Sequence, residues 1–564
     1  MASAESKEHG SEWRLGLEAG ESAPPPPPRT DQPRDRGRER LERPLQVVTI
    51  EHLGWALIAL YAVASRLVGL GARPLDAGEA RRAIAAFNLA GIGSHLPIVH
   101  SPGAGGWIDA LTGALFNFTG AGDCAARAAY AIAGLLLIVM AFEMRGYIGR
   151  AGALGLAAIL AISPAVTWYS RACATPLVAS AMALATINLF MALRARPSRR
   201  RAAMLGIAGG LMAAADISGL ATGIIFVAAM LPLGLWDAVT GRNLMLRIQV
   251  WLDRYGAHLA TVIVAAPAAW AVSRLTLVDG FKPDRLIATA SELMPGAGRA
   301  GLKAGVAFYL PIAGLYEFLI VLMAAAGVGI ILTLRVRSRF AAWCLMWAVG
   351  ALAWGLWMPA REPARILVML LPMAMIGAIG FNWLHRSEFW RYVWIPLALL
   401  AAITLYAGGL ADFVHATPDP TEAPWARHAN LFWSDGATLP TVRRYARAAA
   451  AGLPPEAATV AYLGAVAPEI RWYLRDLRPV SDPAIASVIA VEDAAAPPVS
   501  SEATVRQFDY SEAWRPDLAT ADASRIARFV ASGEIWGEIT PRQATLIRRP
   551  IGPAAPTVIL TPPG

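Results

Sequence analysis

The chain has 564 residues, of which 56% are hydrophobic and 16% are charged, and its mean hydropathy is +0.45. Soluble proteins average roughly 45–50% apolar and about 25% charged residues, so a soluble enzyme, a disordered scaffold and a coiled coil are excluded for the whole chain. The formal net charge is +9, but the basic residues form short clusters between long apolar runs. They therefore indicate membrane topology and not a nucleic-acid partner. Three cysteines are too few for a disulfide framework or a Cys-x-x-Cys zinc site.

Residues 1–46 are polar and contain five consecutive prolines followed by six arginines. Such a segment cannot bury enough apolar surface to offset its ordering entropy, so it is predicted to be a disordered cytoplasmic tail. It does not resemble a cleavable signal, because its charged region is too long and no short apolar core precedes a small-residue cleavage site. The first apolar run is therefore expected to remain as a membrane anchor.

Residues 47–411 are predicted to form a transmembrane domain, because their apolar runs are long enough to cross roughly 30 Å of hydrocarbon as helices. We predict eleven spans, at 48–70, 126–144, 151–169, 176–193, 202–216, 219–236, 257–277, 307–334, 340–357, 366–384 and 391–411. The run 106–119 contains Asp109 and Asn117, and it is predicted to lie flat at the membrane interface.

The distribution of basic residues supports this count. With the N-terminus inside, the predicted cytoplasmic segments hold 21 Lys and Arg residues, and the predicted outer segments hold ten over a greater length. This is the bias expected of short cytoplasmic loops. If 106–119 crossed the membrane, the five arginines between 194 and 201 would lie outside. We therefore predict a multi-pass protein of the plasma (inner) membrane with a cytoplasmic N-terminus.

The chain becomes polar after residue 411, and residues 412–564 are predicted to form a small extracytoplasmic α/β domain. Its predicted helices are 441–450 and 468–476. Its predicted strands are 459–463, 487–491, 544–547 and 557–560.

The first outer loop carries candidate catalytic residues. Asp76 and Glu79 lie three residues apart, and His100 and Asp109 follow in the same outer segment. Carboxylates at a bilayer surface can act as a general base or bind a divalent cation such as Mg²⁺ or Mn²⁺. The alternative is a solvated loop whose charges pair with each other.

Two further outer patches contain arginines that suit a phosphate. Tyr169 and Arg171 end the third predicted span, and Arg361, Glu362 and Arg365 follow the ninth. A guanidinium near the headgroups can bind a phospholipid or a polyprenyl phosphate through two parallel hydrogen bonds. The alternative is a snorkelling side chain that marks the interface. The predicted topology places all three patches on the outer side.

Several short motifs follow one another in a definite order between residues 48 and 175. The order is set by Pro74, Leu75, Glu79, Ala80, Pro102, Gly122, Arg127, Ser163, Pro164, Ser170 and Arg171. It resembles the first third of the GT-C type polytopic glycosyltransferases, in the branch related to dolichyl-phosphate-mannose protein mannosyltransferases. Two later segments are similar to a bacterial and archaeal subgroup: Arg361-Glu362-Pro363 with Leu370-Leu371-Pro372 and Gly377, and Trp472-Tyr473-Leu474-Arg475-Asp476. The likeness covers about half of the chain, in patches.

The resemblance implies a polyprenyl-phosphate-sugar donor in the membrane lipid and a glycan, lipid or protein acceptor that enters from the outer side. It also implies an inverting displacement in which an outer-loop aspartate is the base. The family's aspartate position is Gly78 here, and the nearest aspartate, Asp76, lies two residues earlier. After Arg171 the family has an arginine and an acidic residue where this chain has Ala174 and Pro176.

The roles expected from this resemblance are as follows. Asp76 is the base and Glu79 orients the acceptor or a cation; the donor phosphate is bound by Arg171, Arg361 and Arg365; further substrate-site candidates are His100, Asp109, Tyr169 and Glu362. Two other classes of function stay open. The departures from the family pattern favour a catalytically silent membrane subunit. A lipid or glycan transporter is the other, although the predicted spans are nearly free of charge and contain no repeat.

Overall fold

The computed structural model describes residues 50–92, 106–232, 244–273, 317–333, 338–357, 363–409, 439–492, 504–515 and 538–548, with short gaps in the C-terminal part and a few isolated residues besides. The predicted tail 1–46, the predicted strand 557–560, His100, Arg361 and Glu362 lie outside these residues. So do the predicted domain boundaries at 46 and 411, which stay predictions.

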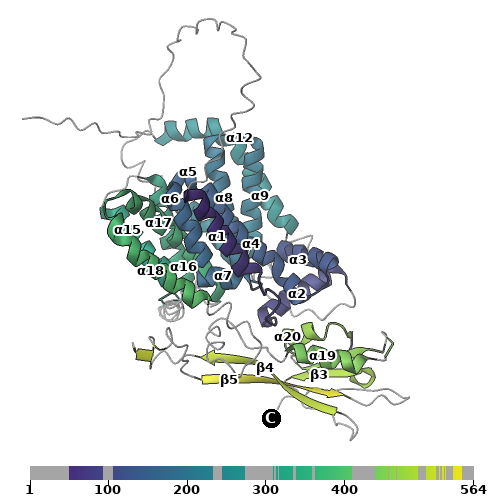
Figure 1. The fold of residues 1–564 in the computed structure, drawn as a ribbon. Coiled ribbons are helices and arrows are strands. Elements are labelled where there is room, and N and C mark those ends of the chain that lie inside the picture. The colour runs from purple at the N-terminus through teal and green to yellow at the C-terminus, as the bar shows by residue number, and fades with distance from the viewer. Residues whose placement is uncertain are drawn as a thin grey trace, which may run out of the picture. The chain divides into compact units, whose positions relative to one another are not determined.

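Most of the described chain is helical (Figure 1). The helices before residue 410 are α1 (Ile50–Leu67), α2 (Ala77–Ala90), α3 (Gly106–Thr119), α4 (Asp123–Glu143), α5 (Arg145–Ile148), α6 (Arg150–Ile162), α7 (Pro164–Ser170), α8 (Thr175–Ala195), α9 (Arg199–Ala215), α10 (Ile217–Ala228), α12 (Leu244–Ala271), α15 (Phe318–Thr333), α16 (Arg339–Trp357), the 3₁₀ turn η2 (Pro363–Arg365), α17 (Ile366–Arg386) and α18 (Trp390–Gly409). Each of the eleven predicted spans overlaps one of these helices, or in the case of 151–169 a pair of them.

Several of these helices are suited to a membrane. Four of them, α4, α8, α16 and α17, are long and apolar enough to cross it, and the bent pair α6 and α7 makes a fifth if it is one span. Shorter apolar helices are found in α10, α15 and α18. The chain is therefore a multi-pass membrane protein, while the total of eleven crossings stays a prediction.

Helix α3 coincides with the run predicted to lie at the interface. Its 14 residues would span only about 21 Å at about 1.5 Å per residue, so it is too short for a straight crossing. It packs against α2 and α4, and it also contacts α9. Its apolar face, with Ile108 and Phe116, is buried in these contacts.

Glycines allow helices α15 and α17 to pack closely. A Cβ atom on Gly380 of α17 would lie 2.6 Å from the Cα of Gly327 of α15. Lipid tails are as apolar as leucine, so transmembrane helices associate through close packing of small residues of this kind. Helix α17 contacts α6 and α16 as well, and it is one of the most deeply buried helices of the described bundle.

The third predicted span is broken. Helices α6 and α7 meet at Ser163-Pro164 with a bend of 63°. Proline at the first position of α7 removes one backbone donor and ends the preceding helix, as expected for a kink at proline. The break leaves carbonyl groups at the end of α6 and N–H groups at the start of α7 that need partners.

Two buried charges, Arg66 and Glu317, supply these partners; with Ser163 we call them the helix-break cluster. Arg66 donates to the carbonyl oxygen of Leu160 at 3.1 Å, near the end of α6. Glu317 accepts from the Ser163 hydroxyl at 2.8 and 2.9 Å and from the Ala165 N–H at 2.6 Å. A cation at a helix C-terminus and an anion at a helix N-terminus both interact favourably with the helix dipole.

The C-terminal region contains a five-stranded mixed sheet. Its elements are α19 (Leu439–Ala450), β1 (Thr459–Gly464), α20 (Pro468–Tyr473), β2 (Arg478–Val480), the 3₁₀ turn η5 (Pro483–Ile485), β3 (Val488–Glu492), β4 (Thr504–Arg515) and β5 (Glu538–Arg548). The strand order is β2-β1-β3-β5-β4. Strand β1 pairs in parallel with β2 and β3, whereas β5 is antiparallel to β3 and β4.

The predicted helices 441–450 and 468–476 and strands 459–463, 487–491 and 544–547 are confirmed as α19, α20, β1, β3 and β5. Helix α20 ends at Tyr473, three residues earlier than predicted. The three-residue strand β2 was not predicted, and neither was β4. A register shift between Asp509 and Ser511 interrupts its pairing with β5, and such a bulge hides the alternation of period two by which strands are predicted.

Candidate functional site

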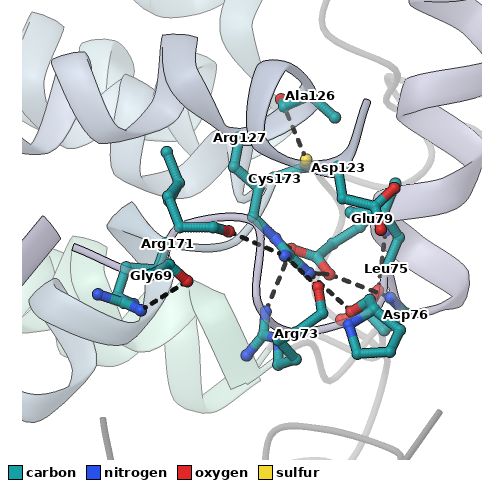
Figure 2. Close-up of polar contacts among 12 residues, drawn as sticks. Gly69, Arg73, Leu75, Asp76, Glu79, Asp123, Ala126, Arg127, Arg171 and Cys173 are labelled. Atoms are coloured by element: carbon teal, nitrogen blue, oxygen red, sulfur yellow. Dashed lines mark hydrogen bonds and ion pairs between the residues drawn. The ribbon is translucent and has the colours of Figure 1, made fainter. Parts of the chain in front are cut away.

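The candidate catalytic carboxylates lie at the start of α2. Asp76 is the N-cap residue, and its Oδ1 accepts from the Glu79 N–H at 2.8 Å. Glu79 in turn accepts from the Asp76 N–H at 3.0 Å through Oε2. This reciprocal pair is a capping box, which explains why the helix begins here. The two predicted catalytic residues are therefore in direct contact (Figure 2).

Arg127 of α4 binds this helix start and the loop that precedes it. Its Nε and Nη2 donate to the two oxygens of Glu79 at 2.8 and 2.6 Å. The remaining N–H groups donate to the carbonyl oxygens of Leu70, Arg73 and Pro74 at 3.1, 2.6 and 2.8 Å. All five donors of the guanidinium are thus used. Arg127 is fully buried, so it fixes the whole loop between α1 and α2 to α4 (Figure 2).

Arg73 adds a second cation to Glu79. Its Nη2 donates to Oε1 of Glu79 at 3.2 Å, and its guanidinium lies 4.3 Å from the ring centre of Trp168. We call Glu79, Arg127 and Arg73 the loop anchor. It is a buried carboxylate with two arginines, in which every polar group of Glu79 is engaged.

The two carboxylates differ in basicity. Burial by itself would raise the pKa of Glu79, but the charges of Arg127 and Arg73 and the hydrogen bonds from Arg127 and the Asp76 backbone lower it to about 2. Burial, together with the negative charge of Glu79, raises the pKa of Asp76 above its ordinary value. Glu79 is therefore ionised at neutral pH and a poor base, and Asp76 is the better base of the two.

Arg171 lies at the other end of the same loop. Its Nη1 donates to the carbonyl oxygens of Ser65 and Val68, each at 2.7 Å, and its Nη2 donates to that of Gly69 at 3.2 Å. These carbonyls end α1, where a cation is favourable. The predicted phosphate ligand thus has a structural role at the α1 terminus, and its binding of a donor phosphate stays a prediction (Figure 2).

The remaining described candidates are buried on three other elements. Asp109 lies on α3 and accepts from the Tyr130 hydroxyl at 3.4 Å. Tyr169 lies on α7, and Arg365 ends η2 directly before α17. His100, Arg361 and Glu362 fall outside the described residues. The structure thus gathers Asp76, Glu79 and Arg171 around one loop, and it leaves the roles of the others as predictions.

No family model matches the chain, and no curated protein matches it in sequence. The structure is similar to the crystal structure of ArnT from Cupriavidus metallidurans bound to undecaprenyl phosphate, with a TM-score of 0.51 and 15% identity over 78% of this chain and 93% of that one. The apo structure of the same protein gives a TM-score of 0.47 and 15% identity over 76% and 86%. The fold is of the GT-C type. This confirms the predicted fold class, an α-helical membrane bundle with a small C-terminal sheet.

The described residues around the loop between α1 and α2 do not form a set of ligands for a divalent cation. Among the residues that the structure describes, no group of three or more His, Cys, Asp and Glu side chains is arranged to hold a metal ion. Both oxygens of Glu79 accept hydrogen bonds from arginines or from the Asp76 backbone. The divalent cation stays a prediction.

Several residues that stabilise this fold were not assigned a role from the sequence. Arg66 and Glu317 lie inside predicted spans, where an ionisable residue is functional or structural by default, so this signal was available. The Asp-x-x-Glu spacing of Asp76 and Glu79 is also a recognisable capping box. The contact of Tyr473 with this loop joins residues about 400 positions apart, and nothing local predicts it.

Proposed function

We propose that the protein is a membrane glycosyltransferase that transfers a sugar from a polyprenyl-phosphate-linked donor to an acceptor on the outer face of the plasma membrane. The observation that carries this proposal is the GT-C fold with a base-and-anchor carboxylate pair, Asp76 and Glu79, on the loop that follows α1. The similar ArnT structure contains undecaprenyl phosphate, which is a polyprenyl phosphate. That chemistry supports a lipid-linked donor here.

The proposed reaction is a single displacement with inversion. The acceptor hydroxyl forms a bond to the anomeric carbon, the bond from this carbon to the phosphate oxygen breaks, and polyprenyl phosphate leaves. Asp76 accepts the hydroxyl proton. A raised pKa suits this role, because a stronger base takes the proton further in the transition state.

Glu79 has a different part in this proposal. Because its carboxylate is buried and bound by Arg127 and Arg73, it anchors the start of α2 and keeps Asp76 at the end of a fixed helix. The negative charge of Glu79 also raises the pKa of Asp76. The donor phosphate is assigned to Arg171, Arg361 and Arg365, and the C-terminal region to the outer side of the membrane.

The test uses purified full-length protein in lipid nanodiscs with radiolabelled polyprenyl-phosphate sugars. Release of polyprenyl phosphate and transfer of label to added acceptors are measured. We expect Asp76→Asn to lower turnover by about 10²–10⁴-fold while donor binding is unchanged, since the amide keeps size and polarity but accepts no proton. The control is Asp253→Asn, an exposed aspartate on α12, which should match the parent. Normal turnover by Asp76→Asn would place the base elsewhere, with Asp109 tested next.

One observation favours a catalytically silent subunit instead. The family's aspartate position is Gly78, and Asp76 already serves as an N-cap. A Cβ atom on residue 78 would lie 3.2 Å from Oδ1 of Asp76, so an aspartate there would stand beside it. If the parent is inactive with every donor and Gly78→Asp creates turnover, the silent subunit is the correct function.

A further inference from the structure

The C-terminal region contacts the loop between α1 and α2 through α20. We call this loop, residues 68–76, the reactive loop because it carries Asp76. Trp472 and Tyr473, the last residues of this helix, are 0% and 2% exposed. The ring of Trp472 lies 6.3 Å from that of Phe87 on α2 and 5.9 Å from that of Phe116 on α3. Helix α20 thus packs on α2, and its Trp472 also contacts Phe116 of α3.

Both residues bind the carboxylate of Asp123, the first residue of α4. Trp472 Nε1 donates to Oδ1 at 2.8 Å, and the Tyr473 hydroxyl donates to Oδ2 at 2.6 Å. We call these three residues the aromatic clamp. Hydrogen bonds to an ionised carboxylate are stronger than neutral ones, and a negative charge in the first turn of a helix is favourable. The adjacent Arg475 reinforces the contact by donating to the Ala121 carbonyl at 2.8 Å.

The Tyr473 hydroxyl has a second partner in the reactive loop. The backbone N–H of Leu75 donates to it at 3.0 Å. An N–H can only donate and a carboxylate can only accept, so the hydroxyl must donate to Asp123 and accept from Leu75. Burial and the charge of Asp123 raise the pKa of Tyr473, so the hydroxyl keeps its proton. One oxygen therefore bridges α4 and the residue directly before Asp76.

Three side chains fix the backbone that leads into Asp76. Arg127 of α4 binds the carbonyls of residues 73 and 74, and Glu79 of α2 binds the N–H of residue 76. Tyr473 binds the remaining N–H, that of Leu75. Two of these side chains belong to the helical bundle, and the third lies 398 positions away from Leu75 in the sequence.

We propose that Tyr473 is a positioning residue through which the C-terminal region sets the position of Asp76. The hydroxyl accepts a hydrogen bond from the Leu75 N–H and so fixes this residue. Because Leu75 directly precedes Asp76, the N-cap carboxylate at the start of α2 is positioned as well. The effect on turnover rests on the proposed function, whereas the effect on the loop does not.

Hydrogen exchange of the full-length protein in nanodiscs tests the loop directly. Tyr473→Phe removes only the hydroxyl, so the Leu75 amide should exchange about five- to tenfold faster, as expected for the loss of one hydrogen bond. Pro74 has no amide, which simplifies the assignment. The matched control is Tyr462→Phe on β1, because the Tyr462 hydroxyl makes no hydrogen bond among the described residues. It should leave Leu75 unchanged.

Turnover tests the consequence for Asp76. Tyr473→Phe should lower kcat about tenfold with the donor KM within about twofold, because a displaced base slows the reaction without weakening binding. Asp123→Asn keeps the Tyr473 hydroxyl but weakens its acceptor, so it should give a smaller change of the same kind. It also serves as the second variant if Tyr473→Phe does not fold.

Each outcome has one meaning. Unchanged exchange at Leu75 in both Tyr473→Phe and Asp123→Asn overturns the proposal, whatever the activity. Faster exchange with unchanged kcat also overturns it, since the loop then moves without consequence for Asp76, and the proposed function stands. A parent that transfers no sugar overturns the proposed function, and exchange at Leu75 still decides whether the clamp holds the loop.

Discussion

The loop anchor and the helix-break cluster both bury charge, and they compensate it in different ways. In the loop anchor, the carboxylate of Glu79 touches the guanidinium of Arg127 at 2.6 Å. In the helix-break cluster, Glu317 binds the N-terminus of α7, and Arg66 binds carbonyls at the end of α6. One cluster uses opposite charges in contact, and the other uses the two ends of an interrupted helix.

The two clusters should differ in how well they tolerate the loss of a charged side chain. A contact ion pair locks two segments together, because removing one partner leaves the other charged and buried. A charge on a helix end instead satisfies backbone groups that the break has exposed, and it tolerates loss better because the dipole is only a partial charge. The loop anchor should therefore be the more sensitive of the two clusters.

The largest effect is expected for Arg127→Ala. It leaves Glu79 buried without its main partner and removes the donors to three loop carbonyls, so stability should fall by about 3–5 kcal/mol. Thermal unfolding followed by tryptophan fluorescence measures this change. The control is Arg150→Ala, since Arg150 is 83% exposed and its pair with Glu51 is at 3.8 Å. Equal melting temperatures for the two variants would contradict the contrast.

Acid should weaken the loop anchor selectively. The pKa of Glu79 is lowered from about 4.5 when unfolded to about 2 when folded, so its contribution is complete above about pH 4.5 and is lost as the pH falls toward 2. At about 1.4 kcal/mol per unit, this amounts to about 3 kcal/mol. The raised pKa of Asp76 acts in the opposite direction.

The measurement is the melting temperature of the parent between pH 6 and pH 3, compared with that of Glu79→Gln. The glutamine variant cannot titrate at this position, so its curve should be flatter over the acid range. Parallel curves would mean that Glu79 does not titrate with a lowered pKa.

A smaller loss is expected for Glu317→Gln in the helix-break cluster. The amide keeps one oxygen as acceptor for the Ala165 N–H but loses the second acceptor oxygen that faces the Ser163 hydroxyl, so stability should fall by about 1–2 kcal/mol. Thermal unfolding measures it beside Arg127→Ala. If Glu317→Gln lost as much stability as Arg127→Ala, the helix-break cluster would be as sensitive to substitution as the loop anchor.

The sequence predicts the membrane helices well because apolar length is a local property. All eleven predicted spans overlap helices, and the exclusion of 106–119 agrees with the short α3. The break in the third span is marked by Pro164, but its 63° bend and its two charged partners depend on tertiary contacts. Those contacts join segments more than 90 positions apart, where periodicity carries no information.

The candidate site was predicted in part. Asp76 and Glu79 were placed together because they share one loop, and the structure assigns them unequal basicity through Arg127 and Arg73. Arg171 was identified by its position near the outer end of a span, yet its geometry is that of a helix cap. The sequence could not distinguish these roles, because an arginine that binds phosphate and one that binds carbonyls occur in the same apolar context.

The smallest effect on stability is expected for Arg171, whose charge lies at the end of α1. Its planar guanidinium donates to three carbonyls at the end of α1, and a lysine keeps the charge but lacks this fork. If capping is its only task, Arg171→Lys should lower stability by about 1 kcal/mol and leave the donor affinity unchanged. If it also binds the donor phosphate, the affinity for a polyprenyl-phosphate sugar should fall as well. Equilibrium binding in nanodiscs, with Arg150→Lys as the control, separates these outcomes. A fall in affinity without any loss of stability would make Arg171 a phosphate ligand, and its contacts with α1 would then be secondary.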